Sequence, residues 1–215
     1  MATSDTEIAN QALLHLGVSK EISNLTTEQS REANICRRFY TLALEEILSD
    51  FRWPFATRIQ RLNKIRDNPN VDWGKEYRYP PDAHVIRRIV TGNRNETHDQ
   101  GVPFRVASDA AGRVIWTDQT DADVEYTIKV TDVLLFPPSF VASLSYLLGM
   151  KIAPALTQGD PFKRAEYCAQ MYGFELKKAQ SNDKMEEQRD AAPHAEWDRA
   201  RGGGTTTRQD WPTWP

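Results

Sequence analysis

The spacing of apolar residues changes twice along this 215-residue chain, and prolines lie at both changes. As far as Pro54, apolar side chains recur every three or four residues, the spacing that lines one face of an α-helix. Between residues 57 and 132 the spacing falls to two, the period of a half-buried β-strand. Helical spacing returns after Pro137 and Pro138. This order is explained most simply if the helices pack together as a bundle and the strands form a region inserted between them.

Two helices are predicted in the first part of the chain. In the first, Ser4 and Glu7 form a capping box and Gly17 provides the stop, so this helix is short. The second is predicted to begin at Thr26 and to continue for about seven turns, because apolar residues recur at alternating spacings of three and four as far as Phe51.

Two further helices are predicted after the strands. The third begins after Pro138, with Ser139 as its cap, and ends near Gly159. The fourth begins at Asp160, a capping residue followed by a proline suited to the first helical turn, and reaches about Lys184. Six side chains on the helical stripes are expected in the bundle core: Tyr40, Ile47, Phe51, Leu144, Leu148 and Tyr172.

The segment between the helices predicts a sheet of roughly four or five strands. The clearest strand is 124–130, where apolar and polar residues alternate. Two short apolar runs on either side of the polar turn 108–112 predict a hairpin, and 84–90 is a further strand. Segments 66–75 and 91–100 are rich in Asn, Asp and Gly and are predicted to be surface loops.

The predicted fold class is α+β. It is mainly an α-helical bundle of four helices, with an inserted antiparallel β-rich region and an extended C-terminal tail. Residues 1–56 and 137–190 are expected to form the bundle, 57–136 the β-rich insertion and 191–215 the tail.

Composition limits the classes of protein that we expect. The formal net charge is -3 and the mean hydropathy is -0.62. No stretch approaches the roughly 18 apolar residues of a transmembrane helix, so we expect no membrane contact. The first ten residues contain Asp5 and Glu7 instead of a basic and then an apolar region, so we expect no secretory leader. Cys36 and Cys168 are expected to be reduced core thiols, because neither has a Cys or His neighbour at ligand spacing.

The motifs that carry catalysis or hold phosphate are missing from the sequence, which has no G-x-S-x-G, P-loop, H-E-x-x-H or G-x-G-x-x-G pattern. The acidic residues Asp118, Asp121 and Asp123 lack the glycine and terminal glutamate of a calcium loop. The histidines stand in separate segments without metal-ligand spacing: His15, His84, His98 and His194. We therefore expect no enzyme, no cofactor and no metal site.

The segment from residue 51 to 94 is locally basic, with ten Lys or Arg residues against four Asp or Glu. Five arginines in it are candidate contacts with DNA or with a neighbouring subunit: Arg58, Arg61, Arg87, Arg88 and Arg94. Solvent-facing or internally paired side chains are the alternative interpretation.

The C-terminal tail combines polarity with large aromatic rings. Trp197, Trp211 and Trp214 lie in a segment too polar to build its own core, so we expect them to anchor the tail on a partner, with Arg208 adding a charged contact. Two alternatives stay open: the indoles fold back onto their own subunit, or the tail is a disordered terminus.

Short motifs occur in a set order along residues 5–185: Ile8 to Gly17 (IANQALLHLG), Phe51 to Phe55 (FRWPF), Tyr77 to Asp82 (YRYPPD), Pro103 to Val106 (PFRV), Ile115 to Asp118 (IWTD), Val124 to Tyr126 (VEY), Phe136 to Phe140 (FPPSF) and Lys151 to Thr157 (KIAPALT). In this order they resemble the bacteriophage head-to-tail adaptor proteins, in particular the tail tubular protein A group. The part of the chain after residue 190 carries no motif of that family.

The resemblance implies a structural virion protein. Copies of such an adaptor form a ring, commonly of about twelve, below the portal protein; the ring extends the DNA channel and docks the tail nozzle or the next tail component. Assembly in the bacterial cytoplasm, a place in the virion at the head-tail interface, passing contact with genomic DNA and a part in genome ejection follow as expectations. The resemblance also implies a helical bundle with a β-rich excursion.

Two other classes of function remain as alternatives. A stand-alone DNA-binding or regulatory protein using the basic 51–94 region would be expected to place a basic recognition helix in the groove, yet the positive charges lie mostly among the strands. A hydrolase would need convergent catalytic groups in one pocket.

Overall fold

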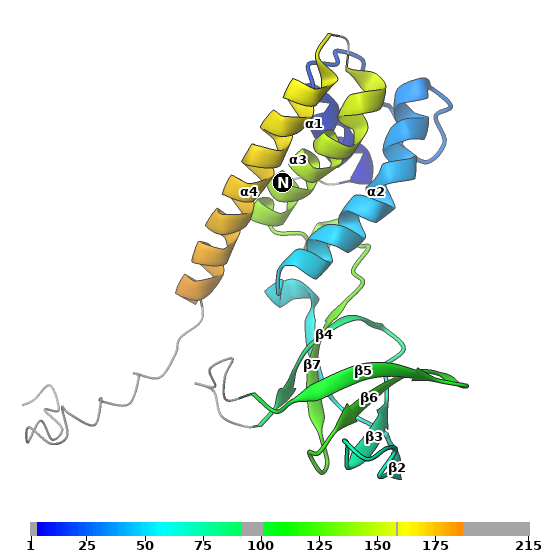
Figure 1. Cartoon of the computed structure of the whole chain (residues 1–215). Coiled ribbons are helices and arrows are strands. Elements are labelled where there is room, and N and C mark those ends of the chain that lie inside the picture. The colour runs from blue at the N-terminus through cyan, green and yellow to red at the C-terminus, as the bar shows by residue number, and fades with distance from the viewer. Residues whose placement is uncertain (1–3, 92–100, 158, 187–215) are drawn as a thin grey trace, which may run out of the picture.

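A computed structural model describes residues 4–91, 101–157 and 159–186. Its helices lie on one side of the molecule and its strands on the other (Figure 1). The helices are α1 (Asp5–His15), α2 (Arg31–Asp50), α3 (Pro138–Leu156) and α4 (Pro161–Glu186). The strands are β1 (Thr57–Arg61), β2 (Lys64–Asp67), β3 (Lys75–Arg78), β4 (Ala83–Val90), β5 (Phe104–Asp109), β6 (Gly112–Thr117) and β7 (Asp123–Ile128). Two 3-10 turns, η1 (Pro54–Ala56) and η3 (Val133–Leu135), connect the two regions.

Both ends of α1 are as predicted. The amide of Glu7 donates to Ser4 Oγ at 3.2 Å, which caps the first turn. At the other end Gly17 has a φ of +76°, which only glycine adopts without strain. The amides of Gly17 and Val18 donate back to the carbonyls of Leu14 and Leu13, which is the Schellman arrangement.

The predicted cap of α2 is wrong by four residues. Ser30, not Thr26, caps this helix, because its Oγ accepts from the amide of Ala33 at 3.3 Å. Thr26 instead belongs to a turn in which the Asn24 side chain accepts from the amides of the next residues. The predicted end is confirmed, since α2 ends before Pro54 with Trp53 in an extended conformation.

The two prolines start α3, and the predicted cap Ser139 is wrong. Pro137 is the N-cap without a side-chain hydrogen bond, and Pro138 is the first helical residue, so Ser139 lies inside the helix. The start of α4 is confirmed, because Asp160 Oδ1 accepts from the amide of Lys163 at 3.1 Å.

α3 corrects the expectation that no segment is long and apolar enough to span a membrane. The helix has 19 residues, and an 18-residue window of it has a mean hydropathy of 1.4, which meets that criterion by length and composition. Its apolar residues are buried by other helices instead, because α3 packs against α1, α2 and α4. Of the apolar 18-residue stretch, 56% is buried. A central helix in a bundle is apolar on most of its circumference for this reason.

The seven strands form two antiparallel sheets, where the sequence predicted one sheet of four or five strands. One sheet has the order β1-β7-β4 and the other β2-β3-β6-β5. The predicted strands at 84–90 and 124–130 correspond to β4 and β7, and the hairpin is β5 and β6. Three strands were not predicted: β1, β2 and β3. β1 and β2 are almost entirely exposed, so their residues lack the alternation that marks a half-buried strand, and β3 begins at the last residue of the predicted 66–75 loop.

The two sheets share a small core of their own. Tyr77 and Ile115 from one sheet and Ile86, Val124 and Tyr126 from the other belong to one buried cluster. The loop predicted at 66–75 is partly correct, because it begins inside β2 and ends in β3. Most of the second predicted loop, from residue 92 to 100, lies outside the described residues.

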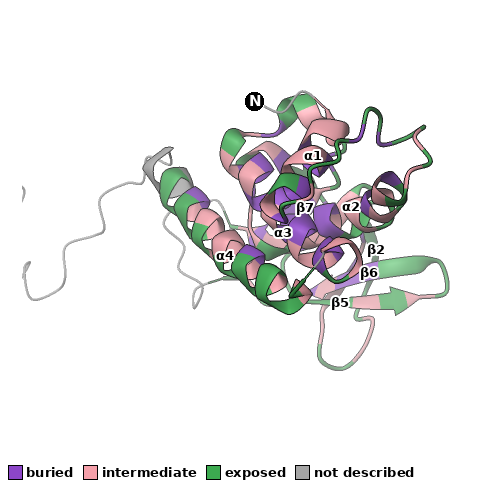
Figure 2. Ribbon diagram, turned by 90° about the horizontal axis from the view of Figure 1, so that it is seen from above, coloured by how far each residue is buried: buried purple, intermediate pink, exposed green. Residues whose placement is uncertain are grey.

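The bundle core is densest around α3. Gly149 lets three helices approach, because a Cβ there would lie 3.2 Å from Cys168 Sγ on α4 and 3.6 Å from the carbonyl oxygen of Ala12 on α1. Both cysteines are buried and free, as predicted. Viewed from above the helices, the buried surface faces inward on every helix (Figure 2).

Three of the six predicted core residues are fully buried: Ile47, Leu144 and Leu148. Tyr40, Phe51 and Tyr172 are only partly buried and pack against the core from its edge. The hydroxyl of Tyr172 donates to Asp50 Oδ2 at 2.5 Å, so the tyrosine keeps its polar end at the surface. Burial, together with this hydrogen bond, raises the pKa of Tyr172.

Leu148→Ala should lower the unfolding free energy by about 2–5 kcal/mol, because it leaves a cavity where the side chain is 0% exposed. The matched control is Leu42→Ala on α2, where the leucine is 52% exposed and the change should stay below about 1 kcal/mol. Urea melts followed by circular dichroism measure both. Equal losses at the two positions would contradict the assigned core.

Candidate functional site

Arg87 on β4 completes the C-terminus of α2. The last turn of α2 contains no basic residue and ends in Asp50, whose charge opposes the helix dipole. The Arg87 guanidinium donates to three carbonyl oxygens there, those of Leu48 at 2.6 Å, Ser49 at 2.9 Å and Phe51 at 2.8 Å. Burial is the main reason that the pKa of Arg87 is lowered, and the nearby Arg52 charge adds to the effect.

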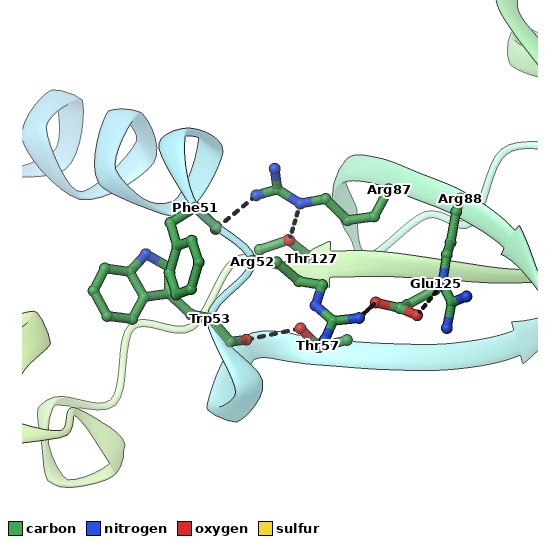
Figure 3. Close-up of polar contacts among 8 residues, drawn as sticks. All are labelled: Phe51, Arg52, Trp53, Thr57, Arg87, Arg88, Glu125 and Thr127. Carbon is green, nitrogen blue, oxygen red and sulfur yellow. Dashed lines mark hydrogen bonds and ion pairs between the residues drawn. The ribbon is translucent and has the colours of Figure 1, made fainter. Parts of the chain in front are cut away.

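A buried carboxylate lies beside this cap. Glu125 on β7 is 2% exposed and accepts from Arg52 at 2.7 Å and from Arg88 at 2.8 Å (Figure 3). Arg52 follows the end of α2 directly, whereas Arg88 lies on β4. One carboxylate therefore joins the chain that leaves the bundle to two neighbouring strands.

A β-bulge explains how adjacent arginines reach the same place. Successive residues on a strand normally point to opposite faces. Arg87 nevertheless donates to Thr127 and Arg88 to Glu125, two residues that share one face of β7. The register between β4 and β7 shifts between Ile86 and Arg88, and such a bulge turns both side chains to one side.

We define these residues, Arg52, Arg87, Arg88, Glu125 and Thr127, as the arginine junction. Arg87 and Arg88 are thus committed to contacts within the chain. Glu125 and Thr127 were not predicted as site residues. The sequence does carry one signal for this site. The last turn of α2 has no basic residue, so its free carbonyl oxygens need a hydrogen-bond donor from another segment.

Two other predicted arginines lie on β1 and remain more exposed. Arg58 is ion-paired with Asp82 at 3.0 Å, and its side chain is 59% exposed. Arg61 lies 3.7 Å from a carboxylate oxygen of Asp121, and both side chains are mostly exposed. Arg94 falls outside the described residues, as do all four predicted tail residues: Trp197, Arg208, Trp211 and Trp214.

The basic region is partly neutralised by acids from later in the chain. Glu125 pairs with Arg52 and Arg88, and Asp109 pairs with Arg78 at 3.1 Å. Glu125 lies outside residues 51–94 but on β7, which pairs with the β4 strand of Arg88. Asp109 on β5 reaches Arg78 on β3 across β6, with which both strands pair. The positive excess counted along the sequence is therefore larger than the free positive charge on the surface.

Two serine-histidine pairs occur among the described residues, and in both the serine Oγ also donates to a carbonyl oxygen of its own helix. Ser145 Oγ donates to the Ala142 carbonyl, so His15 Nε2, 3.1 Å away, must itself donate to that oxygen. Ser145 is also only 1% exposed. In the second pair Ser49 Oγ and His84 Nε2 both contact the Glu45 carbonyl, which can only accept. Neither imidazole is placed to remove the serine proton.

The described residues contain no group of three or more His, Cys, Asp or Glu side chains placed to hold a metal ion. Asp118 instead accepts from the amide of Gly74 at 2.7 Å, and Asp121 pairs with Arg61. Burial raises the pKa of the Cys36 thiol to about 12, which suits an unreactive core side chain.

Comparison with known proteins adds nothing to this geometry: no protein-family model matches the chain, and no curated protein matches it.

Replacing both Arg52 and Arg88 with methionine should lower the unfolding free energy by about 3–5 kcal/mol, because a buried carboxylate loses its partners. Adding Glu125→Gln should recover most of this loss, since the buried group is then uncharged. Arg61→Met is the control, and its exposed pair should contribute no more than about 1 kcal/mol. Denaturant melts of the four proteins decide the point, and no rescue by the third substitution would refute a buried-charge penalty.

Proposed function

We propose that the protein is a bacteriophage head-to-tail adaptor: a structural virion component whose copies form a ring below the portal, extend the DNA channel and dock the next tail component. The motif order along residues 5–185 supports this, and so does a helical bundle with an inserted β-rich region, the architecture that the resemblance implies. The protein acts by assembly and carries out no chemical reaction.

The observation that carries the proposal is the presence of exposed apolar side chains on opposite sides of the bundle. α3 lies between α2 and α4, which form opposite sides of the bundle (Figures 1 and 2). On α4, Tyr167 is 46% and Phe174 60% exposed, and their spacing of seven residues places them on one face. On the other side, Leu42 of α2 is 52% exposed.

Two different apolar faces favour a head-to-tail contact between copies. An isologous dimer would use one self-complementary patch, whereas a contact between unlike faces repeats from subunit to subunit and closes into a ring when the rotation allows it. The arginine junction is suited to such a ring, because it holds the bundle and the sheets in one orientation in every copy.

The runner-up function is DNA binding through the basic region. Arg52, Arg87 and Arg88 are paired internally, so the described arginines of this region that stay more than half exposed for phosphate contacts are Arg58, Arg61 and Arg66. That is more compatible with passing contact between a ring and DNA in its channel than with a regulator that depends on phosphate contacts for affinity.

The ring should be visible when the protein is mixed with the portal protein of its phage, by negative-stain imaging and mass photometry. Tyr167→Glu/Phe174→Glu breaks one face and Leu42→Glu the other, so either variant alone should form no ring. Mixed together, the two variants should form only pairs, because one intact contact remains. Wild-type mixtures without rings at any ratio would contradict the adaptor proposal. Rings from either variant would instead contradict these faces.

The tail should bind the portal through its indoles. Replacing Trp197, Trp211 and Trp214 with alanine should weaken portal capture at least tenfold, because each ring can bury a large apolar area in a partner pocket. Arg208→Gln should have a smaller effect. A thermal melt verifies that the variant is folded at the assay temperature, and unchanged portal capture by the triple variant would refute this role for the tail.

A further inference from the structure

An apolar groove lies at the base of the bundle, where the chain passes between helices and strands. Its volume is about 400 Å³, and it is lined by Phe51, residues 53–55 and 134–139, and Ala179 and Asn182 of α4. None of the side chains that line it is charged. Two neighbouring leucines stand in it largely uncovered, Leu134 at 75% and Leu135 at 57% exposed. We refer to this feature as the base groove.

The floor of the base groove is a rigid aromatic cluster. Trp53 is 2% exposed, its indole donates to the Ile47 carbonyl at 2.8 Å, and its ring meets Phe140 edge-on at 4.8 Å between centroids. Phe55 packs against Phe136 at 5.7 Å. Grooves lined by aromatic rings are the recognition surface that proline-rich segments use.

We propose that the base groove binds the C-terminal segment Trp211–Pro215 of the same chain in the subunit that has not yet assembled. The proposal does not depend on the adaptor function, because it concerns the isolated subunit. In that subunit the segment covers the exposed leucines, and it leaves when a partner captures the tail.

The spacing of the segment fits a groove of this kind. Trp211 and Trp214 are three residues apart, and each precedes a proline, which favours an extended or polyproline II backbone. A polyproline II helix has three residues per turn, so the two indoles share one edge, about 9 Å apart. Residues 211–215 carry no charged side chain, which matches the uncharged lining.

The position where α4 ends gives the segment access to the groove. Asn182 lines the groove, and α4 continues to Glu186, about 6 Å farther along the helix axis. Trp211 follows about 25 residues later, a length that spans as much as about 80–90 Å when extended. The segment can therefore return to the groove of its own subunit. A tether of this length gives a high effective concentration, so a weak contact is sufficient.

A photo-crosslinker tests the proposal in the full-length protein. Trp211→p-benzoylphenylalanine should crosslink to the residues that line the groove, with the products mapped by mass spectrometry: Phe51, 53–55, 134–139, Ala179 or Asn182. Mixing unlabelled and nitrogen-15-labelled protein should give crosslinks only within single copies. Crosslinks between copies, to other residues, or none at all would overturn the proposal.

Two further variants link the crosslink to the groove and to the tryptophan spacing. Leu135→Glu should reduce its yield at least tenfold, whereas Leu14→Glu, a comparably exposed leucine on α1, should leave it unchanged. Inserting one alanine after Thr213 turns Trp214 away from the edge of Trp211 and should also reduce the yield. Equal yields in all these proteins would refute binding in the groove. Failure to form rings with the portal would leave the result intact.

Discussion

The fold depends on how the C-terminus of α2 is satisfied where the bundle meets the sheets. A helix that ends in Asp50, with no basic residue in its last turn, leaves carbonyl groups that need a donor. Arg87 supplies that donor from β4, and the Arg52–Glu125–Arg88 group beside it joins the same region to β7. Because one set of hydrogen bonds ends the helix and holds the strands, the angle between bundle and sheets is coupled to the stability of both.

The arginine junction also shows why charge counted along a sequence overstates charge on a surface. Antiparallel strands bring residues far apart in the chain next to one another, so Glu125 pairs with the arginines at positions 52 and 88 and offsets one of their two charges. A carboxylate that is 2% exposed would be costly alone, and two guanidinium groups make its burial tolerable. Arg52, Arg87 and Arg88 therefore make contacts inside the molecule, whereas Arg58, Arg61 and Arg66 keep more than half of their side-chain surface in solvent.

Helices were predictable here to the extent that their signals are local. The caps at Ser4 and Asp160 and the stop at Gly17 depend on residues within one turn, and all three are confirmed. The predicted start of α2 was wrong because Thr26 and Ser30 can both cap a helix, and the Asn24 side chain holds the amides of Thr26 and Thr27 in a local turn instead. Strands β1 and β2 escaped prediction because exposed strands lack an apolar period. The arginine junction was not predicted because its residues come together only after β4 and β7 pair and the bulge turns the Arg87 side chain.

The prolines that mark the changes of apolar spacing also account for the base groove. Pro54, Pro137 and Pro138 lack the amide donor that a continuing helix or a central strand requires. Regular secondary structure is therefore interrupted at these points and cannot cover the side chains there. The aromatic residues around them pack against one another, yet Leu134 and Leu135 stay exposed. Cover must then come from a segment that needs few backbone hydrogen bonds. A proline-rich stretch with tryptophans at a spacing of three meets that requirement, because polyproline II has no internal hydrogen bonds to lose.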